Sequence, residues 1–201
     1  MSNSLSAQHI STNLANYEAA RTGFFSLIVD NIDNIVKASY TGDPAAASTL
    51  DKITQAQEIL KLNVVKAPVP HFTLKTEQYR RGNDVVKFAG VPDFESGGNI
   101  VVDDVVGMDT KSILMAWQGL AYNVHTRKGG RMKDYKKDCT LCEYTQDFEL
   151  IRSWKLYGCW ISKITEGEFD KETDGKRQIT ATLEYDRAIM ELPNTGATGT
   201  I

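Results

Sequence analysis

The sequence predicts a mainly β protein of the α+β class, in which packed antiparallel β-sheets or a β-barrel carry one flanking α-helix and one inserted helix. Three observations predict this class. Residues 138–162 have the pattern of a long β-hairpin, and residues 178–185 alternate strictly between apolar and polar side chains. Residues 108–124 place apolar side chains at helical spacing. We find no internal repeat.

The predicted hairpin has a first arm at 139–144, a turn near 145–147 and a second arm at 149–161. Side chains alternate along a strand, so one face of the second arm carries Leu150, Trp154, Leu156 and Trp160. The other face begins polar and then becomes apolar at Tyr157, Cys159 and Ile161. A strand that is apolar on both faces needs cover on both sides, either from its own chain or from a neighbouring copy.

The first 70 residues contain one predicted strand and one predicted helix. Residues 1–22 form a polar arm that has Ile10, Leu14 and Tyr17 at helical spacing. Residues 23–29 are rich in aromatic and branched side chains, which favours a strand. Residues 31–70 are interpreted as an insertion with one helix, which begins at Asp43-Pro44 because Asp caps helices and Pro suits their first turn.

The middle of the chain alternates strands with turns. The alternation that starts at Phe72 predicts a half-buried strand, and residues 78–84 read as a loop or hairpin tip. Further strands are predicted at 85–89 and 100–106. In the helix predicted at 108–124, Asp109 is the expected N-cap, and one apolar stripe holds Ile113, Leu114, Trp117, Leu120, Ala121 and Val124.

No motif points to catalysis or to a metal. Cys139 and Cys142 form a CxxC by letter, but residues three apart on a strand point to opposite faces and cannot grip one ion. A disulfide to a neighbouring copy would need an oxidising environment. The three histidines, His9, His71 and His125, lie in unrelated contexts. We therefore predict no catalytic, cofactor-binding or metal site, and no enzymatic activity.

Charge is segregated along the chain. Residues 127–137 hold six cations and one acid, whereas 166–174 is acidic, and the whole chain has a formal net charge of -3. A dedicated nucleic-acid binder is usually strongly basic, so this balance argues against that class. The basic segment is open to three interpretations, which are a solvated loop, a nucleic-acid contact and a contact with the acidic segment of another copy. The last suits head-to-tail self-association.

Localisation signals are few. The first residues lack the charged start and apolar core of a signal peptide, and no apolar run is long enough for a transmembrane helix. Three unevenly spaced cysteines do not make a disulfide framework, so we expect folding in the cytosol.

From residue 23 onward the order of elements resembles the tail tube proteins of contractile-tailed bacteriophages. Four stretches carry the resemblance, and they read GFFSLIV, QYRRGNDVVKFAGVPDF, MDTKSILMAWQGLAYNV, and CTLCEYTQDFELIRSWKLYGCWISKI followed by ITATLEYDRA. The last contains Gly158-Cys159-Trp160 and Thr182-Leu183-Glu184-Tyr185, which match the family's "gcW" and "tLEy" segments. The insertion at 31–70 departs from the compact family pattern.

The resemblance implies a structural subunit. Six copies would form a ring whose inner strands join into one barrel, and stacked rings would form a tube that conducts viral DNA. The domain would span 23–192 with the helical insertion at about 31–70, between the arm at 1–22 and a flexible tail at 193–201. The implied partners are other copies of the chain and the tail sheath, tape measure, baseplate and tail terminator proteins. The implied location is the virion tail, assembled in the host cytoplasm.

Two residue sets follow from combining the pattern with the resemblance. The polar face of the last strand is the expected lumen lining, and it consists of Gln178, Thr180, Thr182 and Glu184. Neutral and acidic groups there would not hold phosphates, so DNA could slide. The candidates for contacts between subunits are Tyr79, Arg80, Arg81, Tyr157 and Ile161.

Two alternatives stay open at the level of sequence. One is the inner tube of a type VI secretion system or a bacteriocin-like injector, which has the same fold. The other is a small β-rich hydrolase or binding domain, which would need a histidine and a carboxylate or nucleophile to converge in a pocket.

Overall fold

The computed structural model describes residues 21–40, 55–94, 97–106, 110–167 and 175–192, and it confirms the strand-rich, antiparallel fold class. Its main sheet has seven strands in the order β1-β8-β9-β10-β5-β2, with β11 paired to β9. The strands are β1 (Phe25–Val29), β2 (Val64–Lys66), β5 (Gly98–Asp103), β8 (Lys137–Tyr144), β9 (Leu150–Glu166), β10 (Gln178–Glu184) and β11 (Arg187–Glu191). Every pairing between them is antiparallel.

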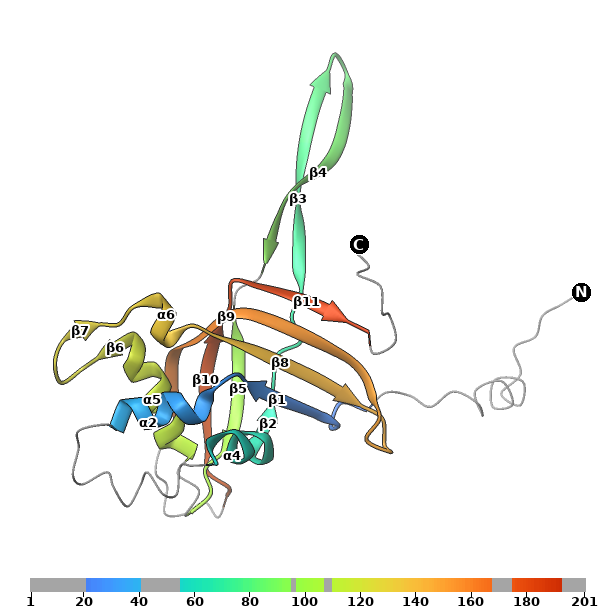
Figure 1. Cartoon of the computed structure of the whole chain (residues 1–201). Helices are drawn as coiled ribbons and strands as arrows, with labels where there is room; N and C mark the ends of the chain where they lie inside the picture. Colours follow the sequence, from blue (N-terminus) through green and yellow to red (C-terminus); the bar gives the residue numbers. More distant parts are fainter. Residues whose placement is uncertain (1–20, 41–54, 95–96, 107–109, 168–174, 193–201) are drawn as a thin grey trace, which may run out of the picture.

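Helices cover one face of this sheet. They are α2 (Ile32–Tyr40), α4 (Ala56–Asn63), α5 (Thr110–Ala121) and the single turn α6 (Met132–Tyr135). Two ribbons lie off the sheet, namely β3 (Phe72–Arg81) with β4 (Asp84–Phe94), and β6 (Tyr122–Asn123) with β7 (Lys128–Gly129). Figure 1 shows the β3–β4 ribbon standing away from the body, on the side opposite α4. None of the described helices is long and apolar enough to span a membrane.

Strand β9 organises the sheet because both halves of its length are paired. Its first half lies between β8 and β11, and its second half pairs with β10. The two halves are joined at Gly158, which has a φ of 68°. There β8 advances two residues, from Lys137 to Cys139, while β9 advances three, from Leu156 to Cys159. One extra residue on one strand is a β-bulge, which bends the strand and increases its twist.

The bulge corrects the prediction that β9 is apolar on both faces. Trp154 and Leu156 face the core before Gly158, and Cys159 and Ile161 face the same core after it. The extra residue shifts the alternation by one, so Trp160 leaves the face of Trp154. Its ring packs edge to face with that of Tyr135, with the two centroids 5.9 Å apart. Strand β9 therefore has one apolar face, which is formed by even-numbered residues before Gly158 and by odd-numbered residues after it. The predicted second apolar face does not exist.

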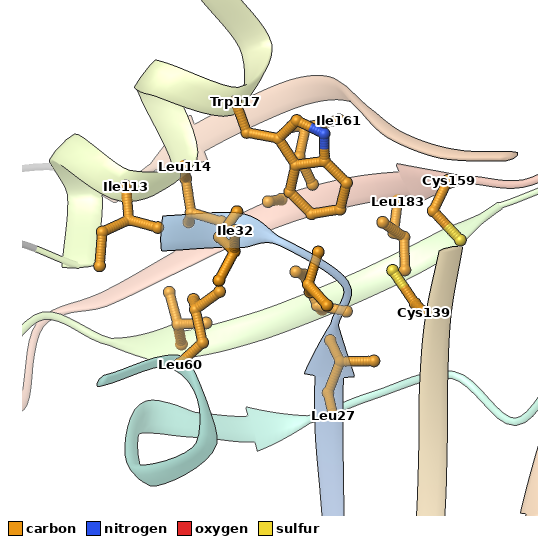
Figure 2. Packing of buried hydrophobic residues seen from close by; sticks show 14 of the residues in the cluster. Leu27, Ile32, Leu60, Ile113, Leu114, Trp117, Cys139, Cys159, Ile161 and Leu183 are labelled. Carbon is orange, nitrogen blue, oxygen red and sulfur yellow. The ribbon is translucent and has the colours of Figure 1, made fainter. Parts of the chain in front are cut away.

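The core lies between the sheet and the helices. Figure 2 shows Ile113, Leu114 and Trp117 of α5 in one cluster with Ile161 and Leu183 of the sheet. The Trp117 ring is 1% exposed, and its Nε1 donates a hydrogen bond of 2.9 Å to the Tyr135 carbonyl. Burial of the ring and satisfaction of its one donor together fix α5 against α6.

The predicted helices are correct in type and wrong in extent. The insertion has two described helices, α2 and α4, where one was expected, and the expected start at Asp43 lies outside the described residues. Asp109, the expected cap of α5, also lies outside them. Helix α5 ends at Ala121, and β6 begins at Tyr122. Val124 is therefore outside the helix, is 75% exposed and does not belong to the buried stripe.

Several short elements were not predicted from the sequence. Strand β2 adds an edge to the main sheet, β11 follows the strand predicted as the last, and the basic segment contains β7 and α6. Each is short, and periodicity needs more residues than that to identify an element. The predicted arm at 1–22 and tail at 193–201 lie, but for residues 21 and 22, outside the described residues.

Candidate assembly surfaces

The β3–β4 hairpin is the most unusual surface of the molecule. All ten residues of β3 are exposed, and so are nine of the eleven in β4 by their burial pattern. This corrects the expectation of a half-buried strand at Phe72. The structure has the predicted hairpin tip within 78–84, but the tip is shorter than expected, because Arg81 pairs with Asp84 and only Gly82 and Asn83 are unpaired. An isolated two-stranded ribbon is marginally stable in water, so it needs a partner to be ordered.

The outer half of the hairpin has one apolar face, which we call the distal patch and define as Tyr79, Val86 and Phe88. Tyr79 pairs with Val86, and Glu77 pairs with Phe88, so the three apolar side chains share a face. They are 61%, 59% and 53% exposed, respectively. Arg80 lies on the opposite face, opposite Val85, and Arg81 closes the ladder at the tip.

The inner half of the hairpin is apolar near its base. Phe72 and Phe94 are paired, with ring centroids 5.6 Å apart. Beneath them a hollow of about 330 Å³ extends to Trp154, Ala188 and Met190 of the main sheet. The hairpin thus offers apolar surface at both of its ends. The sequence alone did not reveal the surface at the base, because its residues come from the hairpin and from two distant strands, β9 and β11.

The other two interface candidates differ in burial. Tyr157 is partly buried, and the Arg187 guanidinium lies 4.6 Å from the centre of its ring. Ile161 is 1% exposed and packs in the chain's own core. Because the bulge at Gly158 turns Ile161 inward, no surface of it is left for a neighbouring subunit, and we remove it from the interface candidates.

The predicted lumen residues lie on the face of β10 that points away from the helices. Gln178 is exposed, while Thr180, Thr182 and Glu184 are partly buried, and the residues between them are core. Gln178 donates to Asp103 at 3.0 Å, Thr182 bonds Asn99 at 2.9 Å, and Ser162 donates to Glu184 at 3.1 Å. These bonds hold the polar groups in fixed positions across three strands.

This polar face also carries cations that sequence reasoning missed. Lys66 of β2 is exposed opposite Val101, and Val101 pairs with Thr180. Lys163 of β9 is exposed directly opposite Thr182, and residues opposite each other in a ladder share a face. Asp103 and Glu184 add two acids to the same face. The face is therefore polar and close to neutral.

Ion pairs fasten the ends of the sheet. Lys111 of α5 and Arg177 both contact Glu166. These two contacts hold the pKa of Glu166 below its usual value, and the hydrogen bond from Lys111 has the largest effect. At the bulge, Lys155 contacts Asp30 at 2.8 Å, which raises the pKa of Lys155. Lys136 contacts Asp186 at 2.7 Å beside Gly158. The pairs tie α5 to β9 and stabilise the bend.

The potentially reactive residues are dispersed. Cys139 and Cys159 face each other in the core, as Figure 2 shows, and burial raises the pKa of the Cys139 thiol well above its usual value. His71 and His125 are both exposed, on separate elements, and His9 lies outside the described residues. Within the described ranges no three His, Cys, Asp or Glu side chains could together hold a metal ion.

Solved structures with a similar fold include complexes of contractile injection systems. The chain aligns with the sheath-tube complex of an extracellular contractile injection system (PVC) at a TM-score of 0.58 and 15% identity, covering 90% of this chain and 97% of that one. The anti-feeding prophage tube-terminating cap gives 0.57 and 14%, with coverages of 87% and 92%. The PVC sheath/tube terminator gives 0.56 and 18%, with coverages of 87% and 97%. At these identities the likeness establishes the fold.

The sequence itself supplies the family. A comparison with curated protein sequences finds no match. The model of the T4-like virus tail tube protein gp19 family matches residues 57–188, a stretch that runs from α4 to β11. That family is structural and not enzymatic. On this match, which covers most of the chain, the protein belongs to the T4-like virus tail tube protein gp19 family.

Proposed function

We propose that the chain is the subunit of a contractile phage tail tube, in which hexameric rings stack around a lumen that conducts DNA. The observation that carries this proposal is the β3–β4 hairpin. It presents seven large apolar side chains above 40% exposure, namely Phe72, Leu74, Tyr79, Val85, Val86, Phe88 and Val91. Exposed apolar surface of this extent on a projecting ribbon marks an interaction site.

The open strand edges support the same assembly. Within the described sheet β1 has one paired neighbour, β8, and β2 has one, β5. An unpaired edge exposes a row of N–H and C=O groups, and pairing with a neighbouring subunit removes that edge. A ring of subunits closed in this way has no free edge.

The polar face supports its assignment to the lumen. Gln178, Thr180, Thr182 and Glu184 present amide, hydroxyl and carboxylate groups, and Lys66 and Lys163 are cations on the same face. Phosphate contacts by Lys and Arg dominate the affinity of proteins for DNA. On this face the acids Asp103 and Glu184 offset the cations Lys66 and Lys163, so DNA would find little to hold and would slide past.

The proposed partners follow from the tube. Other copies are required to build it, and a tail sheath and a terminator are proposed from complexes of those kinds in which the similar folds occur. Tape measure and baseplate proteins and assembly in the host cytoplasm complete the proposal.

The direct test is electron microscopy of the purified chain together with a variant of the hairpin tip. We expect wild-type protein to form rings or tubes. Arg80→Glu/Arg81→Glu should reduce tube yield at least about tenfold, because reversing two charges in a contact replaces attraction with repulsion. The control Arg131→Glu/Lys133→Glu makes the same change in net charge on the body, away from the hairpin and from the open strand edges, and should assemble normally. Unchanged yield from the tip variant would exclude this contact.

A second candidate is the inner tube of a contractile injector that carries cargo other than DNA. The aligned folds come from an extracellular contractile injection system and an anti-feeding prophage, which favours this candidate. Native particles treated with nuclease separate the two. Protected nucleic acid in the tube supports the phage assignment, and empty or protein-filled tubes support the injector.

A further inference from the structure

A pocket and a projecting turn lie at opposite ends of β8, and their chemistries are complementary. The pocket has a volume of about 520 Å³ and is lined by the ends of α2 and α5, by β7 and by Lys137, the first residue of β8. The turn follows the last residue of β8 and consists of residues 145–149. Eight residues of extended strand separate the two by roughly 25 Å. Figure 1 shows α2, α5 and β7, which line the pocket, on the left of the view and the end of β8 on the right.

The pocket has a small apolar floor, three amide side chains and a cationic rim, and the amides are those of Asn31, Asn34 and Asn123. Ile35 and Leu120 supply apolar surface, and Lys128 and Lys137 supply two cations against one acid, Asp134. Glycines keep it open. A Cβ at Gly119 or Gly129 would meet nothing within 4 Å, whereas one at Gly130 would lie 1.8 Å from the Leu120 carbonyl oxygen. Gly130 thus lets β7 approach the end of α5, and the other two glycines leave the space between them empty.

The turn carries one aromatic ring, that of Phe148, between two acids. This ring packs edge to face with Phe24 of the same chain, with centroids 5.9 Å apart, and leaves most of its surface exposed. Phe148 is 74% exposed and has a φ of 60°, which is uncommon for a bulky residue. Thr145 fixes the turn. Its carbonyl accepts from Phe148 N at 3.1 Å, its amide donates to the Glu149 carbonyl at 2.8 Å, and its hydroxyl accepts from Glu149 N at 3.1 Å. Asp147 and Glu149, on either side of the ring, are both exposed.

We infer that the turn at 145–149 of one copy docks in the pocket of the next copy, with Phe148 on the apolar floor and the two acids beside Lys128 and Lys137. This inference rests on the proposed ring and specifies one of its contacts. Complementary surfaces at opposite ends of a subunit make a heterologous contact, which closes into a ring when the rotation allows. A rigid, strained turn suits docking because it loses little freedom on binding.

A charge swap tests the inference. Lys128→Glu/Lys137→Glu and Asp147→Lys/Glu149→Lys should each raise the concentration needed for half-maximal ring formation at least about tenfold in sedimentation velocity, because like charges then meet. The chain that carries all four changes should recover wild-type assembly. The matched control is Arg131→Glu/Lys133→Glu, which reverses two charges of the same segment outside the pocket and should leave ring formation unchanged.

A cross-link tests the contact without relying on charge. All three native cysteines are buried, so Lys128→Cys combined with Asp147→Cys introduces one reactive thiol on each side of the docked contact. Oxidation of assembled protein should give a ladder of covalently joined chains, and neither single variant should give more than a dimer.

The outcomes separate this inference from the function it rests on. Wild-type protein that forms neither rings nor tubes contradicts the proposed function. Wild-type rings accompanied by normal rings from the folded charge variants, or by no ladder from the double cysteine variant, contradict only the docking of the turn. Circular dichroism melting of each variant establishes that it is folded.

Discussion

Replacement of Tyr79, Val86 and Phe88 together by Thr is expected to leave the body folded and to abolish stacking into tubes. The three side chains form the exposed distal patch and contribute nothing to the core. Burying a large apolar side chain is worth about 1.5–3 kcal/mol. Losing three of them should therefore weaken each contact more than about a hundredfold. Thr keeps the β-propensity of the strands, so the hairpin itself remains able to form.

The matched control for this variant lies on the same hairpin. Gln78 and Lys87 pair on the face opposite the distal patch, and Gln78→Thr/Lys87→Thr changes the same ladder without removing apolar surface. Tube length and yield by electron microscopy should match wild type for the control only. Both variants should melt at the wild-type temperature. Normal tubes from the triple variant would show that the distal patch is not a stacking contact.

Gly158→Ala is expected to destabilise the folded subunit by roughly 2–4 kcal/mol. The residue has a φ of 68°, which costs any residue with a Cβ about 1–2 kcal/mol. An added Cβ would also lie 2.2 Å from Asp186 Oδ2. Asp186 would have to move, and its contact with Lys136 at 2.7 Å would break. For a domain of this size the melting temperature should fall by roughly 5–15 °C.

Two further variants separate strain from collision. Asp186→Ala alone should cost little, because exposed ion pairs are worth about 0–1 kcal/mol. In the Gly158→Ala/Asp186→Ala double variant the collision between the added Cβ and Asp186 is absent. The double variant should therefore lose less stability than the sum of the losses in the two single variants. Gly119→Ala, where a Cβ meets open space within a helix, should be neutral or stabilising by up to about 1 kcal/mol. Urea unfolding measures all four, and an unperturbed Gly158→Ala variant would refute the role of the bulge.

The sequence predicted the elements whose side-chain pattern is long and regular. The strict alternation of β10 and the helical stripe of α5 each repeat often enough to identify the element, and the structure has both. The first hairpin arm at 139–144 corresponds to most of β8. Short pieces such as β2 and β7 have too few residues for a period to be seen.

The prediction for the second arm of the hairpin failed from Gly158 onward. Alternation counted across Gly158 places Ile161 on the wrong face, because a bulge adds a residue that no spacing rule can foresee. The glycine was visible in the sequence as an interruption. Its positive φ was not, since that depends on Asp138, Asp186 and the strands that pair on both sides.

The candidate site divides in the same way. The polar face of β10 and the exposed tip at Tyr79–Arg81 were predicted from the sequence alone, because each depends on neighbouring residues of one strand. Tertiary structure alone decided that the whole β3–β4 ribbon leaves the body and that Lys163 joins the polar face. It also formed the pocket between α2, α5 and β7. Local periodicity fixes which side of a strand is apolar, whereas the long-range pairing of segments decides what that side meets.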